Sequence, residues 1–185
     1  MRYDSHTVKF PGALPAAPAV SLDYRDDAVR TVTVKLTGAV ITMADEAGVV
    51  AYGGLKILDL PDGAILFLGA TADLAFTLSA AGINADWDGD FGLGSVTASN
   101  NATLATTEQD YIPTTATPQA SGSATTAKGQ STATESGAIF DGTTTAADVF
   151  LNVLVDDADH NVAGTPTNVI ANGTITFCYA ELGDY

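Results

Sequence analysis

The stretch Val29–Thr37, VRTVTVKLT, alternates apolar and polar residues with a period of two. This period is typical of a β-strand with one buried face, and it does not suit a helix. Gly38 is expected to break that strand before a second apolar run, AVITMA, begins. Short apolar runs recur along the chain, separated by glycine, proline or aspartate turns. The pattern predicts an all-β fold, an antiparallel β-sandwich of jelly-roll type.

Two segments of the chain of 185 residues lack this alternation. Residues 1–27 contain Pro11, Pro15 and Pro18 among small residues, which predicts an extended N-terminal arm. Residues 99–136 are almost entirely threonine, serine, alanine and other small or polar types, which predicts a long loop in which the threonines permit short strands. The expected organisation is therefore an arm over 1–27 and one sandwich domain over 28–185.

Composition excludes several classes of function. The net charge is −15, from 22 acidic against 7 basic residues, so the chain lacks the clustered cations with which proteins bind DNA or RNA. We expect no membrane partner, because the most apolar run, 64–78, is too short to span a bilayer and contains Asp73. The single cysteine, Cys178, excludes an intramolecular disulfide. No secretion signal is visible, so synthesis in a cytoplasm is expected.

The charge is divided unevenly along the chain. Residues 1–35 hold five basic and four acidic residues, whereas residues 36–185 hold two basic against 18 acidic ones. The segment 1–35 is then either a polar tail or an arm that docks on an acidic surface, such as a neighbouring copy of this protein. On the second interpretation, the predicted partner contacts are Arg2, Lys9, Phe10, Arg25 and Arg30.

The stretch 85–94, ADWDGDFGLG, places Asp86, Asp88 and Asp90 at alternate positions, as a calcium loop does. The match to an EF-hand fails, because Phe91 stands where the loop needs glycine and Thr97 stands where it needs glutamate. Three interpretations stay open: a strand with an aromatic buried face, a cation site between strands or subunits, and a partner-docking face. For a cation, the expected additional ligands are Asp156, Asp157 and Asp159.

No arrangement of residues predicts catalysis. The two histidines are His6, in the arm, and His160, in a polar loop. No serine or cysteine has the surroundings of an activated nucleophile, and no phosphate-binding glycine loop is present. We therefore expect a protein that is not an enzyme and needs no cofactor or metal.

Three blocks of the sequence resemble small structural proteins of tailed bacteriophages. They are YGGLKILDLPDGAILFLGATADLAFTLSAAGINADWDGDFGLGS, AIFDGTTTAADVFLNVLVDDAD and GTITFCYAELGDY, and together they cover about 80 of the 185 residues. The resemblance implies a virion protein without catalysis, of the head decoration (capsid cement) type. Such proteins are β-rich, commonly trimeric, and hold the major capsid protein on the outer capsid surface with a terminal arm.

Two other functions fit the same residues. Trp87, Tyr52 and Tyr111 lie among aspartate-containing loops, so a β-sandwich adhesin or carbohydrate-binding module displayed on a virion is one alternative. Sugar sites commonly pair aromatic faces with carboxylates. A tail structural subunit is the other alternative.

Overall fold

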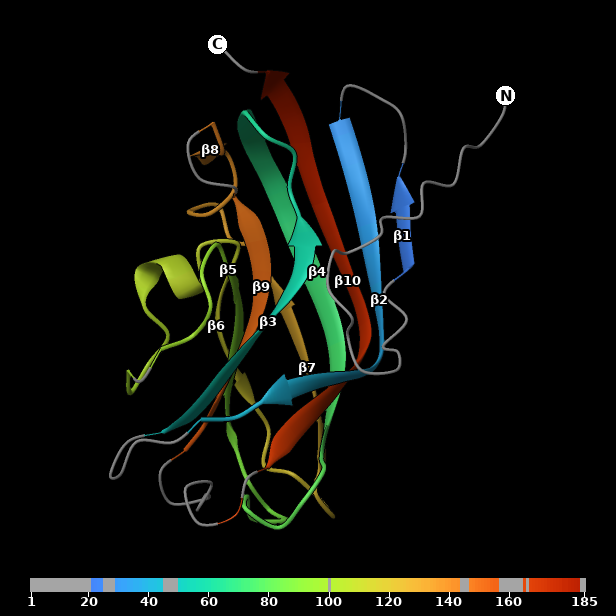
Figure 1. Cartoon of the computed structure of the whole chain (residues 1–185), viewed down its shortest axis with the longest axis vertical. Helices are drawn as coiled ribbons and strands as arrows, with labels where there is room; N and C mark the ends of the chain where they lie inside the picture. The colour runs from blue at the N-terminus through green and yellow to red at the C-terminus, as the bar shows by residue number, and fades with distance from the viewer. Residues whose placement is uncertain are drawn as a thin grey trace.

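The computed structural model describes residues 21–24, 29–44, 50–99, 101–143, 147–156, 165 and 167–183. Within these residues the chain forms short and long β-strands and a single turn of 3₁₀ helix, η1 (Figure 1). The elements are β1 (Ser21–Tyr24), β2 (Val29–Thr42), β3 (Ala51–Asp59), β4 (Ala64–Leu78), β5 (Gly89–Gly94), η1 (Thr106–Glu108), β6 (Ile112–Thr117), β7 (Ala124–Gln130), β8 (Ile139–Asp141), β9 (Asp148–Val155) and β10 (Asn168–Gly183).

The alternation seen in the sequence produces β2. Val32, Val34 and Leu36 are buried, while Lys35 between them is exposed. The predicted break at Gly38 is wrong, because β2 continues to Thr42. Gly38 instead adopts a φ of +64°, and its N–H donates to Asn172 Oδ1 at 2.7 Å beside a register shift in β10. The glycine therefore accommodates a bulge within one strand.

The strands form two antiparallel sheets, which confirms the predicted antiparallel β-sandwich. Sheet A has the order β1-β2-β10-β4-β7, with the short β8 also paired to β4. Sheet B has the order β3-β9-β5-β6. In Figure 1, β2, β10 and β4 run side by side as long ribbons, and β3 and β9 lie in the other layer.

Eight of these strands pair in a nested series. The outermost pair is β2 with β10, followed inward along the chain by β3 with β9, β4 with β7, and β5 with β6. Successive pairs lie in alternate sheets. Because successive pairs alternate between the sheets, each sheet contains strands from both the first and the second half of the chain.

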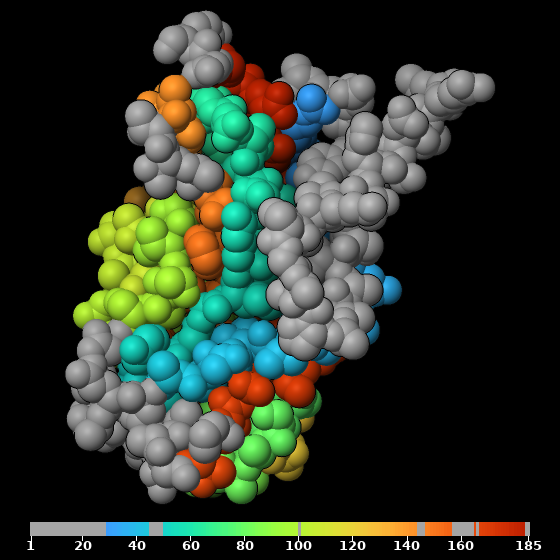
Figure 2. Space-filling model, in the orientation of Figure 1, coloured from blue at the N-terminus to red at the C-terminus, as the bar shows by residue number. Residues whose placement is uncertain are grey.

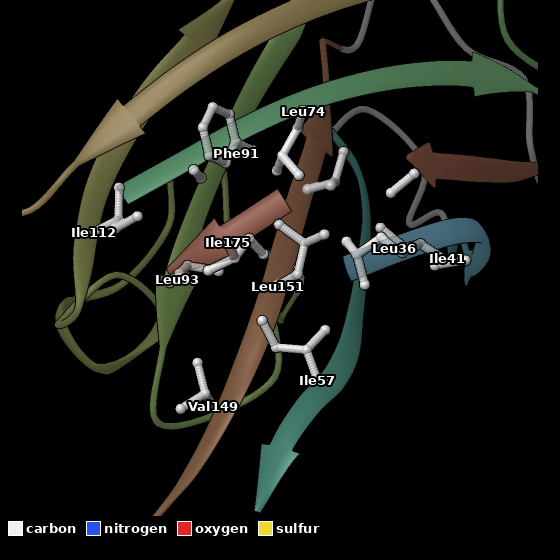
Figure 3. Close-up of a cluster of buried hydrophobic side chains, with 14 of the residues drawn as sticks. Leu36, Ile41, Ile57, Leu74, Phe91, Leu93, Ile112, Val149, Leu151 and Ile175 are labelled. Atoms are coloured by element: carbon white, nitrogen blue, oxygen red, sulfur yellow. The ribbon is translucent and has the colours of Figure 1, made fainter. Parts of the chain in front are cut away.

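The inward faces of both sheets meet in one hydrophobic core. Figure 3 shows Leu36, Leu74 and Ile175 of sheet A lying near side chains of sheet B. The sheet B residues labelled there are Ile57, Phe91, Leu93, Ile112, Val149 and Leu151. A further group of aromatic rings extends the core: the ring centroid of Phe177 lies 4.9 Å from that of Phe67 and 5.0 Å from that of Tyr111. Such ring pairs add to the stabilisation that comes from apolar burial.

Both segments without alternation contain strands. Within the predicted arm 1–27, Ser21–Tyr24 forms β1, which pairs with β2 at the edge of sheet A, and residues 1–20 and 25–27 lie outside the described residues. Within the predicted loop 99–136, β6 and β7 are both present, one in each sheet. The permitted short strands of that segment are therefore integral to the sandwich.

Candidate partner-binding surfaces

Of the predicted partner contacts, only Arg30 is among the described residues. Arg2, Lys9, Phe10 and Arg25 lie outside them. Arg30 stands near the start of β2, and its Nε lies 3.3 Å from Oε1 of Glu181 at the end of β10. The Arg30 side chain is 27% exposed. The Arg30 guanidinium thus forms an ion pair within the fold. Its contact with a partner protein stays a prediction.

The strand predicted over 85–93 begins later than expected. β5 starts at Gly89, and residues 84–87 form a turn in which the Trp87 N–H donates to the Asn84 carbonyl at 3.3 Å. Trp87 is 0% exposed, as the aromatic buried face required. Asp86 is exposed in the turn, so the three aspartates do not line one face of a strand. Gly89, which lies close to the Leu154 backbone, marks the point where the turn becomes strand.

Asp90 lies close to a second carboxylate. β5 pairs with β9, and just beyond β9 the Asp156 N–H donates to the Asp88 carbonyl at 3.3 Å. Burial raises the pKa of the Asp90 carboxyl, and the negative charge of Asp156 raises it further. Asp157, Asp159 and His160 lie outside the described residues. In the part of the chain that the structure describes, no three Asp, Glu, His or Cys side chains gather in a way that could hold a metal ion.

A second ion-pair group lies on sheet B. Lys56 Nζ is 2.8 Å from Asp148 Oδ2 and 3.1 Å from Asp59 Oδ1, and the two aspartates stand opposite each other on β9 and β3. Burial raises the pKa of Asp148, whereas a hydrogen bond with Asp148 lowers the pKa of Asp59. The group ties β3 to β9 at one end of the sheet, and its exposed lysine gives it the character of a surface ion pair.

The segment 95–111 covers the outer face of sheet B. Leu104 and Ala98 pack there against Leu154 of β9 and Val50, in a small second core that Tyr52 borders. In Figure 2 the lime-green residues of this segment form a surface layer beside the orange β9. The outward side of β9 is therefore not a free binding surface.

Asn152 of β9 fixes this cover in place. Its Oδ1 accepts from the Ala98 N–H at 2.8 Å, and its Nδ2 donates to the carbonyls of Val96 and Glu108 at 2.9 and 2.8 Å. Asn152 is 0% exposed although the sequence pattern places it on the polar side of its strand. Sequence reasoning missed its role, because the cover comes from a distant segment and leaves no local signal.

The Glu108 carboxylate organises the same segment from within. It accepts from the Ser99 N–H at 2.9 Å, from the Ser99 hydroxyl at 2.6 Å and from the Ala105 N–H at 2.7 Å. Next to it, both oxygens of Asp110 accept from Ser95, each at 2.7 Å. Three donors satisfy this buried acid, which has no cationic partner within the described part of the chain. Such hydrogen bonds are how a carboxylate is tolerated in the interior of a turn.

The outer face of sheet A has no comparable cover among the described residues. Threonine is frequent among its outward side chains, as on β2, where Thr31 and Thr33 alternate with buried valines. Cys178 is half-buried on this face, with its Sγ 3.5 Å from Thr31 Oγ1. The two sheets therefore differ: the described residues close the outer face of one and leave the outer face of the other uncovered.

Comparison with known proteins returns little. No family model matches the chain, and no curated protein matches it. A search of solved structures returns the crystal structure of the infectious bursal disease virus VP2 subviral particle, at 14% identity and a TM-score of 0.20. That match covers 95% of this chain and 45% of the VP2 chain, so this chain spans less than half of its length. At this TM-score we take nothing about fold or function from the match.

No helix of the described residues has the length and apolarity needed to cross a membrane.

Replacement of Asn152 by alanine should detach the cover of sheet B. The change leaves one N–H and two carbonyls without their partner in a buried place, which costs about 3 kcal/mol in the free energy of unfolding. Urea denaturation measures that loss, and hydrogen exchange should accelerate in residues 95–110. The control is Asn101→Ala, which removes an exposed amide of the same segment. Equal losses in the two variants would contradict the role assigned to Asn152.

Replacement of Asp90 by asparagine should stabilise the protein at neutral pH. Because the folded state raises the pKa of Asp90, stability falls as pH rises through that raised value. The neutral amide removes this loss, so the urea midpoint of the variant should exceed that of the wild type at pH 7. The gain should vanish well below pH 3.8, the ordinary pKa of the group, where the carboxyl is protonated in both states. The exposed Asp86→Asn is the control, and an equal gain there would refute the explanation.

Proposed function

We propose that this protein is a non-enzymatic structural protein of a tailed-phage virion, which decorates and stabilises the capsid exterior by binding the major capsid protein. The observation that supports this most is the nested pairing of eight strands in two sheets. This nested pairing supports the jelly-roll form that the sequence pattern predicts, a domain type found in viral capsid proteins and in lectins. A fold alone does not define a function, so the proposal also draws on charge and on the sequence resemblance.

The charge of the chain favours the outside of a shell over the inside. A protein with 22 acidic and 7 basic residues is repelled by packaged DNA, which is itself densely negative. Three of the four described bases, Arg30, Lys56 and Lys128, are each engaged with a carboxylate of the same chain. The expected setting is therefore an outer capsid surface, reached after synthesis in the host cytoplasm.

The N-terminal arm is the proposed attachment to the capsid. Its described part, β1, is a short strand at the edge of sheet A, where it pairs over Val32–Lys35 of β2. A chain that leaves a sheet edge in this way can continue onto a partner, where main-chain hydrogen bonds supply affinity. The basic residues Arg2 and Lys9 and the aromatic Phe10 are the contacts proposed within it.

The burial of the aromatic residues proposed for sugar binding argues against the carbohydrate-binding alternative. Trp87 and Tyr111 are both 0% exposed, and Tyr52 is half-buried against the small second core. A sugar site needs an aromatic face in contact with solvent, and these side chains do not offer one. No observation in the structure favours a tail subunit over a head protein.

Truncation tests the arm without disturbing the sandwich. Removal of residues 1–20 leaves β1 and both sheets in place, so the thermal midpoint should stay near that of the full chain. Co-sedimentation with capsids that lack this protein should be abolished. A variant with residues 1–20 replaced by a Gly/Ser segment of equal length controls for length alone. Normal capsid binding by either variant would overturn the role of the arm.

A further inference from the structure

The outer face of sheet A, which no described segment covers, is built from four paired strands in register. Thr33 of β2 stands opposite Thr176 of β10, which stands opposite Thr71 of β4. The next row contains Lys35, Thr174, Asp73 and, on β7, Lys128. Residues in such rows lie about 5 Å apart, so hydroxyl and methyl groups form a continuous surface. Apolar side chains border it, with Val40 45% exposed and Leu68 38% exposed.

Acidic residues are scarce on this face, although the chain is strongly acidic. Across residues 31–42 of β2, 168–180 of β10, 66–77 of β4 and all of β7, Asp73 is the only acid. Its Oδ2 lies 2.6 Å from Lys128 Nζ, and Lys35 lies in the same row. Two copies of a chain with a net charge of −15 repel each other over most approaches. Across this face they meet without that repulsion, and the row offers charges of both signs for pairing.

The size of the face suits an interface between proteins. From a strand spacing of about 4.8 Å and a rise of about 3.3 Å per residue, the four strands present roughly 700 Å². That is close to the area that one partner contributes to a stable interface of standard size, about 800 Å². Depletion of charged residues is also the feature that distinguishes the centre of such interfaces from the remaining surface. Sheets pack face to face readily, with strand directions within about 30° of each other.

We propose that the outer face of sheet A is a self-association surface, which docks on the same face of a second copy of this chain. The contact is two-fold, because the same surface serves both copies. The inference goes beyond the proposed function, because it assigns a contact between copies of this chain, and it favours a two-fold pair over the trimer that the sequence resemblance implies. Thr176, at the centre of the face, and the neighbouring Cys178 then lie inside the interface.

The test substitutes glutamate at the centre of this face in the full-length protein. Thr176→Glu brings two like charges together across the two-fold contact, whereas Thr103→Glu places the same charge on the exposed cover of sheet B. Sedimentation equilibrium should show a wild-type dimer that dissociates on dilution, a matching dimer for Thr103→Glu, and a dissociation constant at least about tenfold weaker for Thr176→Glu. Thermal unfolding shows whether both variants are folded.

The unique cysteine supplies a second readout on the wild-type protein. Maleimide labelling of Cys178 should slow several-fold as the concentration of wild type rises through the dimer range, and it should not slow for Thr176→Glu. A wild-type monomer at every concentration, a trimer, or a dimer that Thr176→Glu leaves intact would overturn the inference. No capsid is present in these experiments. Their failure would therefore not bear on capsid binding through the arm, which the truncation experiment tests separately.

Discussion

The structure depends on the burial of the two inward sheet faces against each other, and β10 is the strand that makes this possible. It pairs with β2 on one side and β4 on the other over most of its length, so it joins the beginning and the end of the chain in the middle of sheet A. Its inward residues Ile175 and Phe177 enter the common core. Removal of apolar area from water on this scale is the dominant stabilising contribution in a domain without disulfides.

The outward faces of the two sheets differ in how far the described residues cover them, and the proposed functions depend on that difference. Sheet B is closed by the segment 95–111, which is held by Asn152 and by the Glu108 carboxylate. The described residues leave sheet A with a wide outer face that is rich in threonine and poor in acidic residues. On our proposals, the face of sheet A that the described residues leave uncovered serves contacts between copies of this chain, and the N-terminal segment serves contact with the capsid.

Alternation in the sequence was sufficient to predict the sandwich, because half-buried antiparallel strands repeat with a period of two. The same logic placed Trp87 in the interior. Prediction from alternation failed where contacts with distant parts of the chain determine the local structure. Gly38 proved to be a bulge and not a strand end, since the pairing of β2 with β10 continues past it. The threonine-rich β6 and β7 gave only a weak strand signal because few of their residues are large and apolar.

The polar residues of the candidate surfaces were harder to predict. Asn152 occupies an outward position of β9. It is buried and hydrogen-bonded only because residues 95–111 pack over it. The aspartates at 86, 88 and 90 were grouped by spacing, but a turn before β5 separates the first from the others. The threonine rows of sheet A depend on the register of four strands that are distant in sequence, which no short motif encodes.

Cryo-electron microscopy of the virion that contains this protein tests the central claim most directly. The account predicts density for the sandwich on the outer capsid surface, in contact with the major capsid protein through its N-terminal segment. Density confined to the tail or to fibres, or a sandwich on the inner wall of the capsid, would contradict it.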